Sequence, residues 1–396
     1  MVTKRCPEDW QEYTIGKLGN LINKTISPMD TPDDFFTEYS MPAFDAGQKP
    51  NKVKGYEMQS NRTAITGKVL LFNKLNVRKK RVWLVNAIST NSVCSQEFLP
   101  YTSDEIELGF LKQLLLSDSV TNDFIGMSTG TSNSQKRIQP KSFLNYSVVL
   151  PSLSEQKAIA SALSDIDELI VNLEKIIEKK KNIKTTCLQH MFPQTGQAVP
   201  EMRLPGFTAP WERCKLGDLG TIQTCKRIFK EQTSDVGDVP FYKNGTIGLK
   251  ADAYISRELF EEFKRLYPYP EVGDILISAV GSVGRTAEYT GADEYFQDSN
   301  VVWLKTDGSI EKKYLKVFYQ VIEWLIEGTT VKHLYNDNIL RSTIVMPKDR
   351  TEQRAIGLFF EQLDHLITLH QCKLDKLRMI KQGMMQKLLN GEIRLV

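Results

Sequence analysis

Residues 155–192 read EQKAIASALSDIDELIVNLEKIIEKKKNIKTTCLQHMF, and residues 352–389 read EQRAIGLFFEQLDHLITLHQCKLDKLRMIKQGMMQKLL. The two segments align without a gap at an offset of 197 residues, and about eleven of 38 positions are identical. Chance would give about two or three identities in such a comparison. A second match opens each half. In the first half it consists of Trp10, Gly16, Leu18 and Gly19, which correspond in order to Trp211, Gly217, Leu219 and Gly220 of the second half. In a chain of 396 residues, these matches predict a tandem duplication, that is, a pseudo-two-fold internal repeat.

Each of the two matching segments predicts one long amphipathic helix. Apolar residues recur at spacings of three and four, which places them in one stripe on a helix. The stripe of the first helix comprises Ile159, Leu163, Ile166, Ile170, Leu173 and Ile177, and that of the second comprises Ile356, Phe360, Leu363, Ile367, Leu374 and Leu377. Ser152 to Glu155 and Asp349 to Glu352 resemble capping boxes at the two helix starts.

Helices of this length need partners. At 1.5 Å per residue they would be about 55 Å long, too long to be stabilised by helix propensity alone. The simplest arrangement pairs them with each other as an antiparallel coiled coil. The alternative is that the stripes are the core of an ordinary helical domain. His370 and Lys373 interrupt the second stripe, either fixing the register or facing outward.

The repeat divides the chain into five segments. A first globular part (1–150) is followed by the first helix (151–192), a proline-rich linker (193–208), a second globular part (209–346), and the second helix with the C-terminal tail (347–396). After the opening frame, residues 22–145 and 223–340 of the globular parts do not align with each other. They share only a rhythm of short β-like runs, such as residues 68–72 and 274–278.

The composition argues against several classes of protein. Lysine plus arginine number 51 against 48 acidic residues, so total charge gives no hint of a nucleic-acid partner. The six cysteines form no Cys-x-x-Cys pair, which makes structural zinc and a disulfide framework unexpected. Residues 1–10 lack the apolar run of a signal peptide, and no apolar stretch is long enough to span a membrane. We therefore expect a cytoplasmic protein with no membrane partner.

No catalytic motif is recognisable. The sequence lacks a Walker phosphate loop, a His-Glu-x-x-His zinc motif and a Gly-x-Ser-x-Gly elbow. The segment from Gly281 to Arg285 follows an apolar run and has two interpretations, a phosphate-binding turn or a plain turn after a strand. Any catalysis is expected to come from a partner.

Local charge is more informative than total charge. Residues 58–96 and residues 124–154 contain no acidic side chain at all, yet hold many cations among Asn, Ser and Thr residues. Cations without counter-ions suit a phosphate backbone, and Asn and Arg can read base edges. The alternative is a solvated basic face. The candidate DNA-binding residues in this half are Lys74, Asn76, Arg78, Lys79, Lys80, Arg81, Lys136 and Arg137.

The second half offers weaker candidates, because acidic residues are interspersed among its cations. Their assignment depends on symmetry with the first half. These DNA-binding candidates are Lys226, Arg227, Lys243, Asn244, Arg285 and Lys332.

Several of these motifs together resemble the specificity subunit of type I restriction-modification enzymes. They are the Trp-(x)5-Gly-x-Leu-Gly frame of each half, the Pro-x-x-x-Glu155-Gln156 turn and its Glu352-Gln353 copy, and the C-terminal Gln386-Lys-Leu-Leu-Asn-Gly391. Residues 44–48, 71–76 and 81–83 are similar to one recurrent type of target-recognition domain. Residues 273–277 with Gly281 to Gly284 are similar to another type.

The resemblance implies an α+β fold. It would comprise two mixed α/β target-recognition domains joined by the antiparallel helices, each domain reading one part of a bipartite, asymmetric double-stranded DNA target. The helices would set the spacing between the two parts. Two methyltransferase subunits would dock and methylate adenine with S-adenosylmethionine, and a restriction and translocase subunit would use ATP and Mg²⁺. This chain would be non-catalytic and hold no cofactor. Alternatives are a methyltransferase-only system, a coiled-coil scaffold that binds no DNA, and an endonuclease that acts alone.

Overall fold

The computed structural model describes residues 7–87, 89–130, 135–194 and 196–395. Residues 1–6, from the N-terminal segment discussed above, and residues 131–134, from the second acid-free segment, lie outside this description. The chain divides into two compact units. Unit 1 comprises Met1–Glu174 and Cys372–Val396, and unit 2 comprises Lys175–Gln371. Each unit therefore holds one globular part and about half of each long helix.

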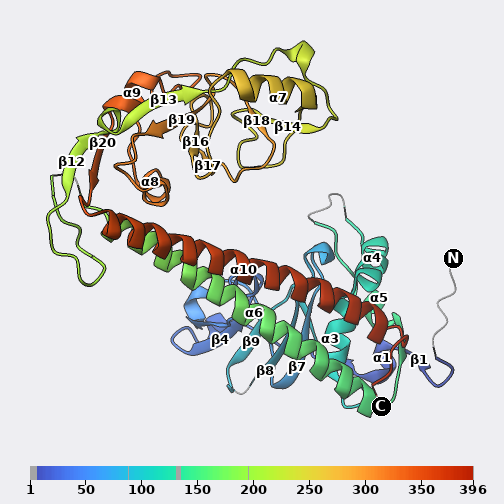
Figure 1. Ribbon diagram of the computed structural model, residues 1–396. Coiled ribbons are helices and arrows are strands. Elements are labelled where there is room, and N and C mark those ends of the chain that lie inside the picture. Colours follow the sequence, from blue (N-terminus) through green and yellow to red (C-terminus); the bar gives the residue numbers. More distant parts are fainter. Residues whose placement is uncertain (1–6, 88, 131–134, 195, 396) are drawn as a thin grey trace. The chain divides into compact units, whose positions relative to one another are not determined.

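Unit 1 contains a four-stranded antiparallel sheet and a five-stranded mixed sheet (Figure 1). The first has the order β2 (Asn20–Leu21), β10 (Phe98–Thr102), β7 (Gly67–Asn73), β8 (Val82–Ala87). The second has the order β3 (Thr25–Ile26), β6 (Arg62–Ala64), β9 (Ser92–Ser95), β4 (Phe35–Tyr39), β5 (Asn51–Lys54). Within it, β4 and β9 are parallel. A separate pair, β1 (Gln11–Thr14) and β11 (Ser147–Leu150), closes the globular part just before the first long helix.

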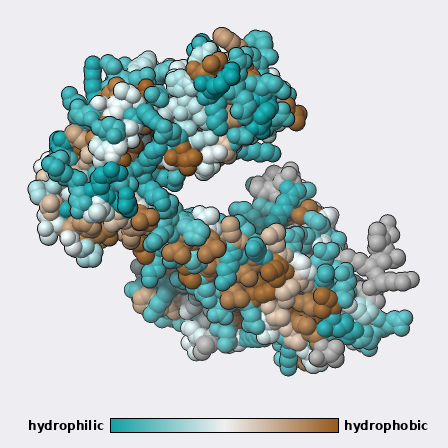
Figure 2. All heavy atoms as spheres, in the orientation of Figure 1, coloured by the Kyte–Doolittle hydropathy of each residue, from teal (hydrophilic) through white to brown (hydrophobic). Residues whose placement is uncertain are grey.

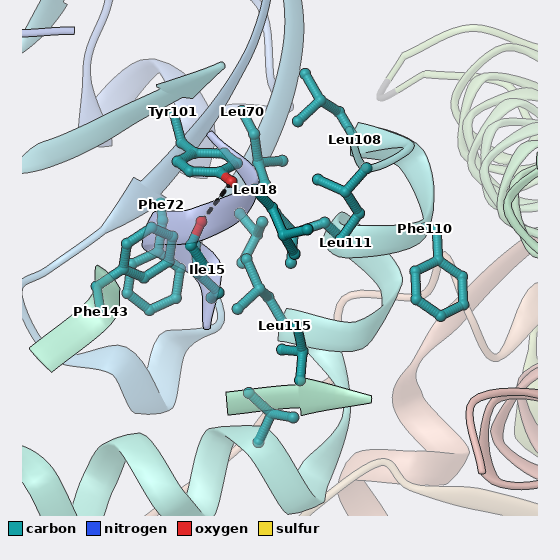
Figure 3. Close-up of a cluster of buried hydrophobic side chains, with 14 of the residues drawn as sticks. Ile15, Leu18, Leu70, Phe72, Tyr101, Leu108, Phe110, Leu111, Leu115 and Phe143 are labelled. Carbon is teal, nitrogen blue, oxygen red and sulfur yellow. Dashed lines mark hydrogen bonds between the residues drawn. The ribbon is translucent and has the colours of Figure 1, made fainter. Parts of the chain in front are cut away.

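The helices of unit 1 cover an apolar core. They are α1 (Ile15–Leu18), α2 (Met41–Asp45), α3 (Leu108–Leu116), α4 (Asp118–Met127) and α5 (Pro140–Leu144). Figure 3 shows leucines of α3 and aromatic residues of the four-stranded sheet converging on this core. The hydroxyl of Tyr101 donates a hydrogen bond of 2.8 Å to the carbonyl of Ile15, so α1 is fixed to β10.

Unit 2 contains a four-stranded antiparallel sheet and a three-stranded mixed sheet. The first has the order β13 (Gly220–Thr224), β19 (Val301–Thr306), β16 (Ile275–Ser278), β17 (Thr286–Glu288). The second has the order β15 (Tyr254–Ile255), β14 (Val239–Tyr242), β18 (Tyr295–Phe296), with β14 and β18 parallel. The pair β12 (Glu212–Lys215) and β20 (Thr343–Met346) again precedes a long helix. The short helices are α7 (Arg257–Leu266), α8 (Lys312–Phe318) and α9 (Asn336–Arg341).

The two globular parts share a scaffold that their sequences do not reveal. The strand orders β2-β10-β7-β8 and β13-β19-β16-β17 correspond, and each unit has one parallel strand pair in its second sheet. Residues 68–72 lie on β7 and residues 274–278 on or next to β16, so the two β-like runs occupy equivalent strands. The expected α+β class and the internal repeat are confirmed.

The glycines of the opening frame are explained by close backbone approach. A Cβ on Gly19 would lie 2.3 Å from the carbonyl oxygen of Thr102, and one on Gly220 would lie 2.2 Å from that of Lys305. These carbonyls belong to the equivalent strands β10 and β19. Both copies of the frame therefore need glycine for the same steric reason.

The two long helices are α6 (Leu153–His190) and α10 (Arg350–Leu388), close to their expected ranges. Within unit 1, Asp167 of α6 pairs with Lys381 of α10 at 2.6 Å. Within unit 2, Lys184 of α6 pairs with Asp364 of α10 at 2.7 Å. Asp167 and Lys184 are the repeat equivalents of Asp364 and Lys381. One duplicated ion pair thus joins the helices antiparallel in each unit.

The apolar stripes combine the two interpretations suggested by the sequence. Their ends belong to the cores of the globular parts, where Ile159 and Leu163 pack in unit 1 and Ile356 and Phe360 pack in unit 2. Four further stripe residues are buried, namely Leu173, Ile177, Leu363 and Leu374. The other four, Ile166, Ile170, Ile367 and Leu377, are only partly buried. Lys373 is exposed and His370 is partly buried, so Lys373 at least faces outward. Coiled-coil register stays a prediction.

The Glu-Gln pair at each helix start has a role that a capping box does not describe. Ser152 does cap α6, accepting from the Glu155 N–H at 3.3 Å. The carboxylates, however, bind arginines from distant segments: Glu155 binds Arg394, and Glu352 binds Arg203 of the linker. Gln156 and Gln353 are also buried, and each accepts a hydrogen bond from the N–H that begins a short helix, α3 or α8. The predicted capping boxes are therefore only half correct.

Candidate nucleic-acid interface

A short basic turn follows strand β7 in unit 1. Its centre is a 3-10 helix, Val77–Lys79, flanked by Asn76 with φ 52° and Lys80 with φ 48°. Non-glycine residues seldom adopt this left-handed conformation, and they do so mostly where surrounding contacts hold them. Val77 is buried in the core of unit 1, whereas Arg78 and Lys79 are exposed. The turn therefore directs two cations into solvent.

The second acid-free segment joins this turn. The N–H of Asn76 donates to the carbonyl of Lys136 at 2.9 Å, and the N–H of Ile138 donates to the carbonyl of Lys74 at 2.9 Å. The two segments are distant in the sequence, but the structure places them side by side. They form one surface, which we call the basic turn surface, made of Lys74, Asn76, Arg78, Lys79 and Lys136.

The cations of this surface form no ion pairs with the acidic residues that the structure describes. Within the described part of the chain, Lys74, Arg78, Lys79 and Lys136 form no ion pair, and Arg78 and Lys79 are exposed. Unpaired cations gathered on one surface favour a polyanion such as DNA. The geometry thus groups five of the eight sequence candidates of this half.

Three further candidates of unit 1 are already paired. Lys80 donates to Asp118 at 2.6 Å, and Arg137 pairs with Glu97 at 3.1 Å, which raises the pKa of Arg137. Arg81 is 9 % exposed and donates from Nε and Nη2 to both oxygens of Asp45 at 2.7 and 2.6 Å. The hydrogen bond from Arg81 lowers the pKa of the Asp45 carboxyl. For Arg81, this geometry favours a structural role over the DNA contact expected from the sequence.

In unit 2, loops bring three of the sequence candidates together. The side chain of Asn244 donates to the carbonyl of Val280 at 2.8 Å, and Arg285 donates to the carbonyl of Gly245 at 2.9 Å. The N–H of Gly281 donates to the carbonyl of Lys332 at 2.9 Å. We call this set, Asn244, Arg285 and Lys332, the loop surface of unit 2.

The other candidates of unit 2 are engaged with neighbours. Arg227 pairs with Asp298 at 2.8 Å, and Lys243 pairs with Asp252 at 3.1 Å. The Lys226 ammonium lies 5.0 Å from the ring centre of Tyr267. These three cations of unit 2 therefore interact with neighbouring side chains, in contrast to those of the basic turn surface.

Sequence reasoning missed a cavity of about 690 Å³ in unit 2. Its lining includes Asn300, His333, Tyr335 and Asn336, and the rings of His333 and Tyr335 stack at 5.7 Å with an interplanar angle of 9°. Amides and exposed aromatic rings can hydrogen-bond to bases and stack on them. The sequence signal was the run Tyr335-Asn-Asp-Asn338, which lacks the positive charge used to find the other candidates.

The glycine turn from Gly281 to Gly284 is a connection between two strands. It joins β16 to β17, and both glycines have positive φ angles of 69° and 80°. Phosphate loops lead instead into a helix N-terminus. The plain-turn interpretation is therefore the correct one. Within the described ranges, no cluster of three or more His, Cys, Asp or Glu side chains could hold a metal, and no helix could span a membrane.

Comparisons with known proteins agree with this architecture. The chain aligns with a protein assigned as a type I restriction enzyme specificity subunit of Haemophilus influenzae, at 49 % identity over 158 residues, 39 % of this chain and 41 % of that protein. It aligns with the MjaVIII specificity subunit of Methanocaldococcus jannaschii at 26 % identity over 283 residues, 65 % of this chain and 64 % of that protein. Both alignments span less than two thirds of the relative.

Solved structures show the same fold. The S subunit of a type I restriction-modification system from M. genitalium has a TM-score of 0.61 at 16 % identity, covering 98 % of this chain and 97 % of that one. A chain from a study of assembly and conformational transition in a type I system has a TM-score of 0.56 at 18 % identity, covering 98 % and 100 %.

The family assignment comes from the sequence of both halves. The type I restriction modification DNA specificity domain matches residues 7–185 and again residues 209–379. Each match takes in one globular part and much of the long helix that follows it. The chain therefore belongs to the type I restriction-modification DNA specificity family, as a specificity subunit with two such domains.

Proposed function

We propose that this chain selects the DNA target of a type I restriction-modification complex, each unit reading one part of a bipartite sequence. The observation that carries the proposal is the basic turn surface, with four cations that form no ion pair in the described part of the chain. Unit 2 has the same scaffold but different loops, so the two parts of the target should differ. The paired helices would set the gap between them, as a two-fold arrangement sets half-site spacing in dimeric readers.

A duplicated groove supports docking of one methyltransferase subunit on each unit. Unit 1 has a groove of about 600 Å³, and unit 2 has one of about 670 Å³. Each is formed by the end of a long helix and the segment after a short one. Five lining positions of the first groove correspond by the repeat to five of the second, three of them in the last turns of the long helix and two just after it: Gln382, Met385, Gln386, Leu389, Asn390 and Thr185, Leu188, Gln189, Phe192, Pro193. A groove built twice from equivalent positions suits a partner that binds twice.

Exposed apolar residues on the long helices are duplicated in the same way. In unit 1, Leu169 is 54 % exposed and Ile380 is 51 % exposed. Their repeat equivalents in unit 2, Leu366 and Ile183, are 38 % and 42 % exposed. Figure 2 shows hydrophobic residues gathered over the long helices. Patches of this kind mark surfaces that bind partners.

The chemistry of the complex would then come from the partners. The chain itself would be non-catalytic. The methyltransferase subunits would transfer a methyl group from S-adenosylmethionine to adenine, and a restriction subunit would use ATP and Mg²⁺ to translocate and cleave DNA. A methyltransferase-only system is the nearest alternative, and a helicase-like gene beside this one would distinguish the two. A scaffold that binds no DNA is a more distant alternative.

The test is reconstitution with the methyltransferase subunits encoded beside the gene. The purified complex should contain two methyltransferase subunits per chain, methylate a limited set of sequences in a random duplex library, and bind them with an affinity that falls steeply with salt. The chain alone should neither methylate nor cut. Salt-independent binding, or methylation without sequence preference, would contradict the proposal and favour the scaffold.

A further inference from the structure

The turn from Asn76 to Lys80 is held firmly although it lies at the surface. The side chain of Asn73 accepts from the N–H of Leu75 at 2.7 Å. The ammonium of Lys80 donates to the carbonyl of Leu116, at the end of α3, at 2.9 Å and also to Asp118. Because Leu116 and Asp118 flank the junction of α3 and α4, Lys80 fixes one side of the turn to two helices.

The other side is closed by the ion pair of Arg81 and Asp45. Asp45 is the last residue of α2, and Arg81 directly precedes β8. The carbonyl of Arg81 also accepts from the N–H of Asn73 at 3.0 Å, where the turn leaves β7. The pair therefore links α2 to the base of the turn. Among the described residues, Arg78 and Lys79 at its tip form no ion pair, although Lys79 is near enough to Asp45 to help lower the pKa of that carboxyl.

We propose that this turn is a preformed DNA-contact element in which Arg78 and Lys79 touch DNA, whereas Lys80, Arg81 and Asp45 are positioning residues that hold it. The inference rests on the function proposed above and divides a set of adjacent cations that the sequence treats alike. A rigid presentation lowers the entropy lost when the two side chains bind. Asp45 becomes a specificity determinant, although an acidic residue near DNA would ordinarily weaken binding.

The contact half of the proposal is tested by salt dependence. The probes are a duplex with the sequence that the wild-type complex methylates and a duplex of scrambled sequence, both bound to the complete complex. Arg78→Ala and Lys79→Ala should each reduce the slope of log affinity against log salt by about one. Both should alter the methylated sequence at the same single half-site. The control is Lys68→Ala, an exposed cation at the opposite end of β7 paired with Glu107, which should change neither.

The positioning half is tested by Asp45→Asn. If Arg81 touched DNA itself, releasing it from Asp45 would strengthen binding and steepen the salt dependence. The proposal predicts the reverse: about a tenfold loss of affinity for the specific duplex, no loss for the scrambled duplex and an unchanged salt slope. The half-site that relaxes must be the one altered by Arg78→Ala. Asp45→Glu, which keeps a carboxylate, should restore most of the selectivity.

The thermal midpoint and the unaltered half-site serve as folding controls for each variant. Stronger specific binding by Asp45→Asn would overturn the positioning role, and an unchanged salt slope and half-site in Arg78→Ala and Lys79→Ala would overturn the contact role. A wild-type complex without sequence preference would instead refute the proposed function, so the two failures are distinguishable.

Discussion

Units 1 and 2 have the same scaffold but carry different surfaces on it. Both have a four-stranded sheet of matching order, a glycine pressed against a strand carbonyl, and a buried Glu-Gln pair at the start of a long helix. The loops, in contrast, share little sequence. Unit 1 exposes Arg78 and Lys79 without an ion pair in the described residues, whereas Arg227, Lys243 and Arg285 of unit 2 are bound by acids or by a backbone carbonyl. The scaffold is thus the same in both copies, and the surfaces proposed to recognise DNA have diverged.

The largest effect should come from lengthening the paired helices. The proposed variant has seven residues inserted after Ile170 and seven after Met379. These insertions add about two turns, or about 10 Å, to each helix without changing its phase. Asp167 and its partner Lys381 stay together on one side of the insertions. The original target should no longer be methylated. A target with unchanged half-sites and a gap longer by about three base pairs should replace it, given the 3.4 Å rise of DNA.

Mapping the DNA sequences methylated by this variant tests whether the helices set the gap while the loops of each unit select the half-sites. An insertion in α6 alone is the control, and it should disrupt the pairing of α6 with α10 rather than lengthen the gap between the half-sites. Altered half-sites in the double insertion would contradict the assignment of spacing to the helices.

The next effect concerns the duplicated Glu-Gln junction. Glu352 is 1 % exposed, binds Arg203 through two hydrogen bonds of 2.7 Å and accepts from the Trp211 indole at 3.2 Å. Glu352→Ala should therefore lower the free energy of unfolding by about 3 kcal/mol, because it leaves a largely buried arginine unpaired. Glu155→Ala should cost less, because Arg394 keeps Asp9 as a partner. Urea titration of both variants measures the difference, and equal losses would show that the second partner contributes nothing.

A smaller effect is expected at the loop surface of unit 2. Asn244→Ala and Arg285→Ala should each reduce discrimination at one half-site by about 1–2 kcal/mol, the loss of a good base contact. That half-site should be the one unaffected by Arg78→Ala. Methylation rates on single-base variants of the target give the measurement, with the exposed Arg265→Ala on α7 as the control. If variants in both units altered the same half-site, the proposal that each unit reads a different half-site would be refuted.

The smallest effect belongs to the duplicated ion pair between the helices. Lys381 and Asp167 are 20 % and 27 % exposed as side chains, and Lys184 and Asp364 are 21 % and 42 % exposed. Lys381→Ala and Lys184→Ala should each cost about 0.5 kcal/mol, as partly exposed pairs do. Double-mutant cycles with Asp167→Ala and Asp364→Ala would measure the coupling. A coupling free energy near zero in one unit alone would show that the ion pair does not stabilise that unit.

The sequence predicted the features that depend on short-range patterns or on repetition. Spacings of three and four gave both long helices to within a few residues, and the repeat gave two similar units. The equivalence of the sheets was hidden, because β7 and β16 share a buried environment rather than specific residues. Ion pairs between residues far apart in the sequence could not be predicted either. No sequence pattern near Arg81 indicates Asp45, and none near Glu352 indicates Arg203. Acid-free runs located the basic turn surface but could not separate contact residues from positioning residues.

The most direct test of the central claim is a genome-wide map of methylated adenines in cells with and without this chain, its methyltransferase partner being present in both. With the chain, methylation should fall on one asymmetric bipartite motif with a fixed gap, and without it the motif should disappear. An identical pattern in both cells would contradict the claim that this chain selects the target.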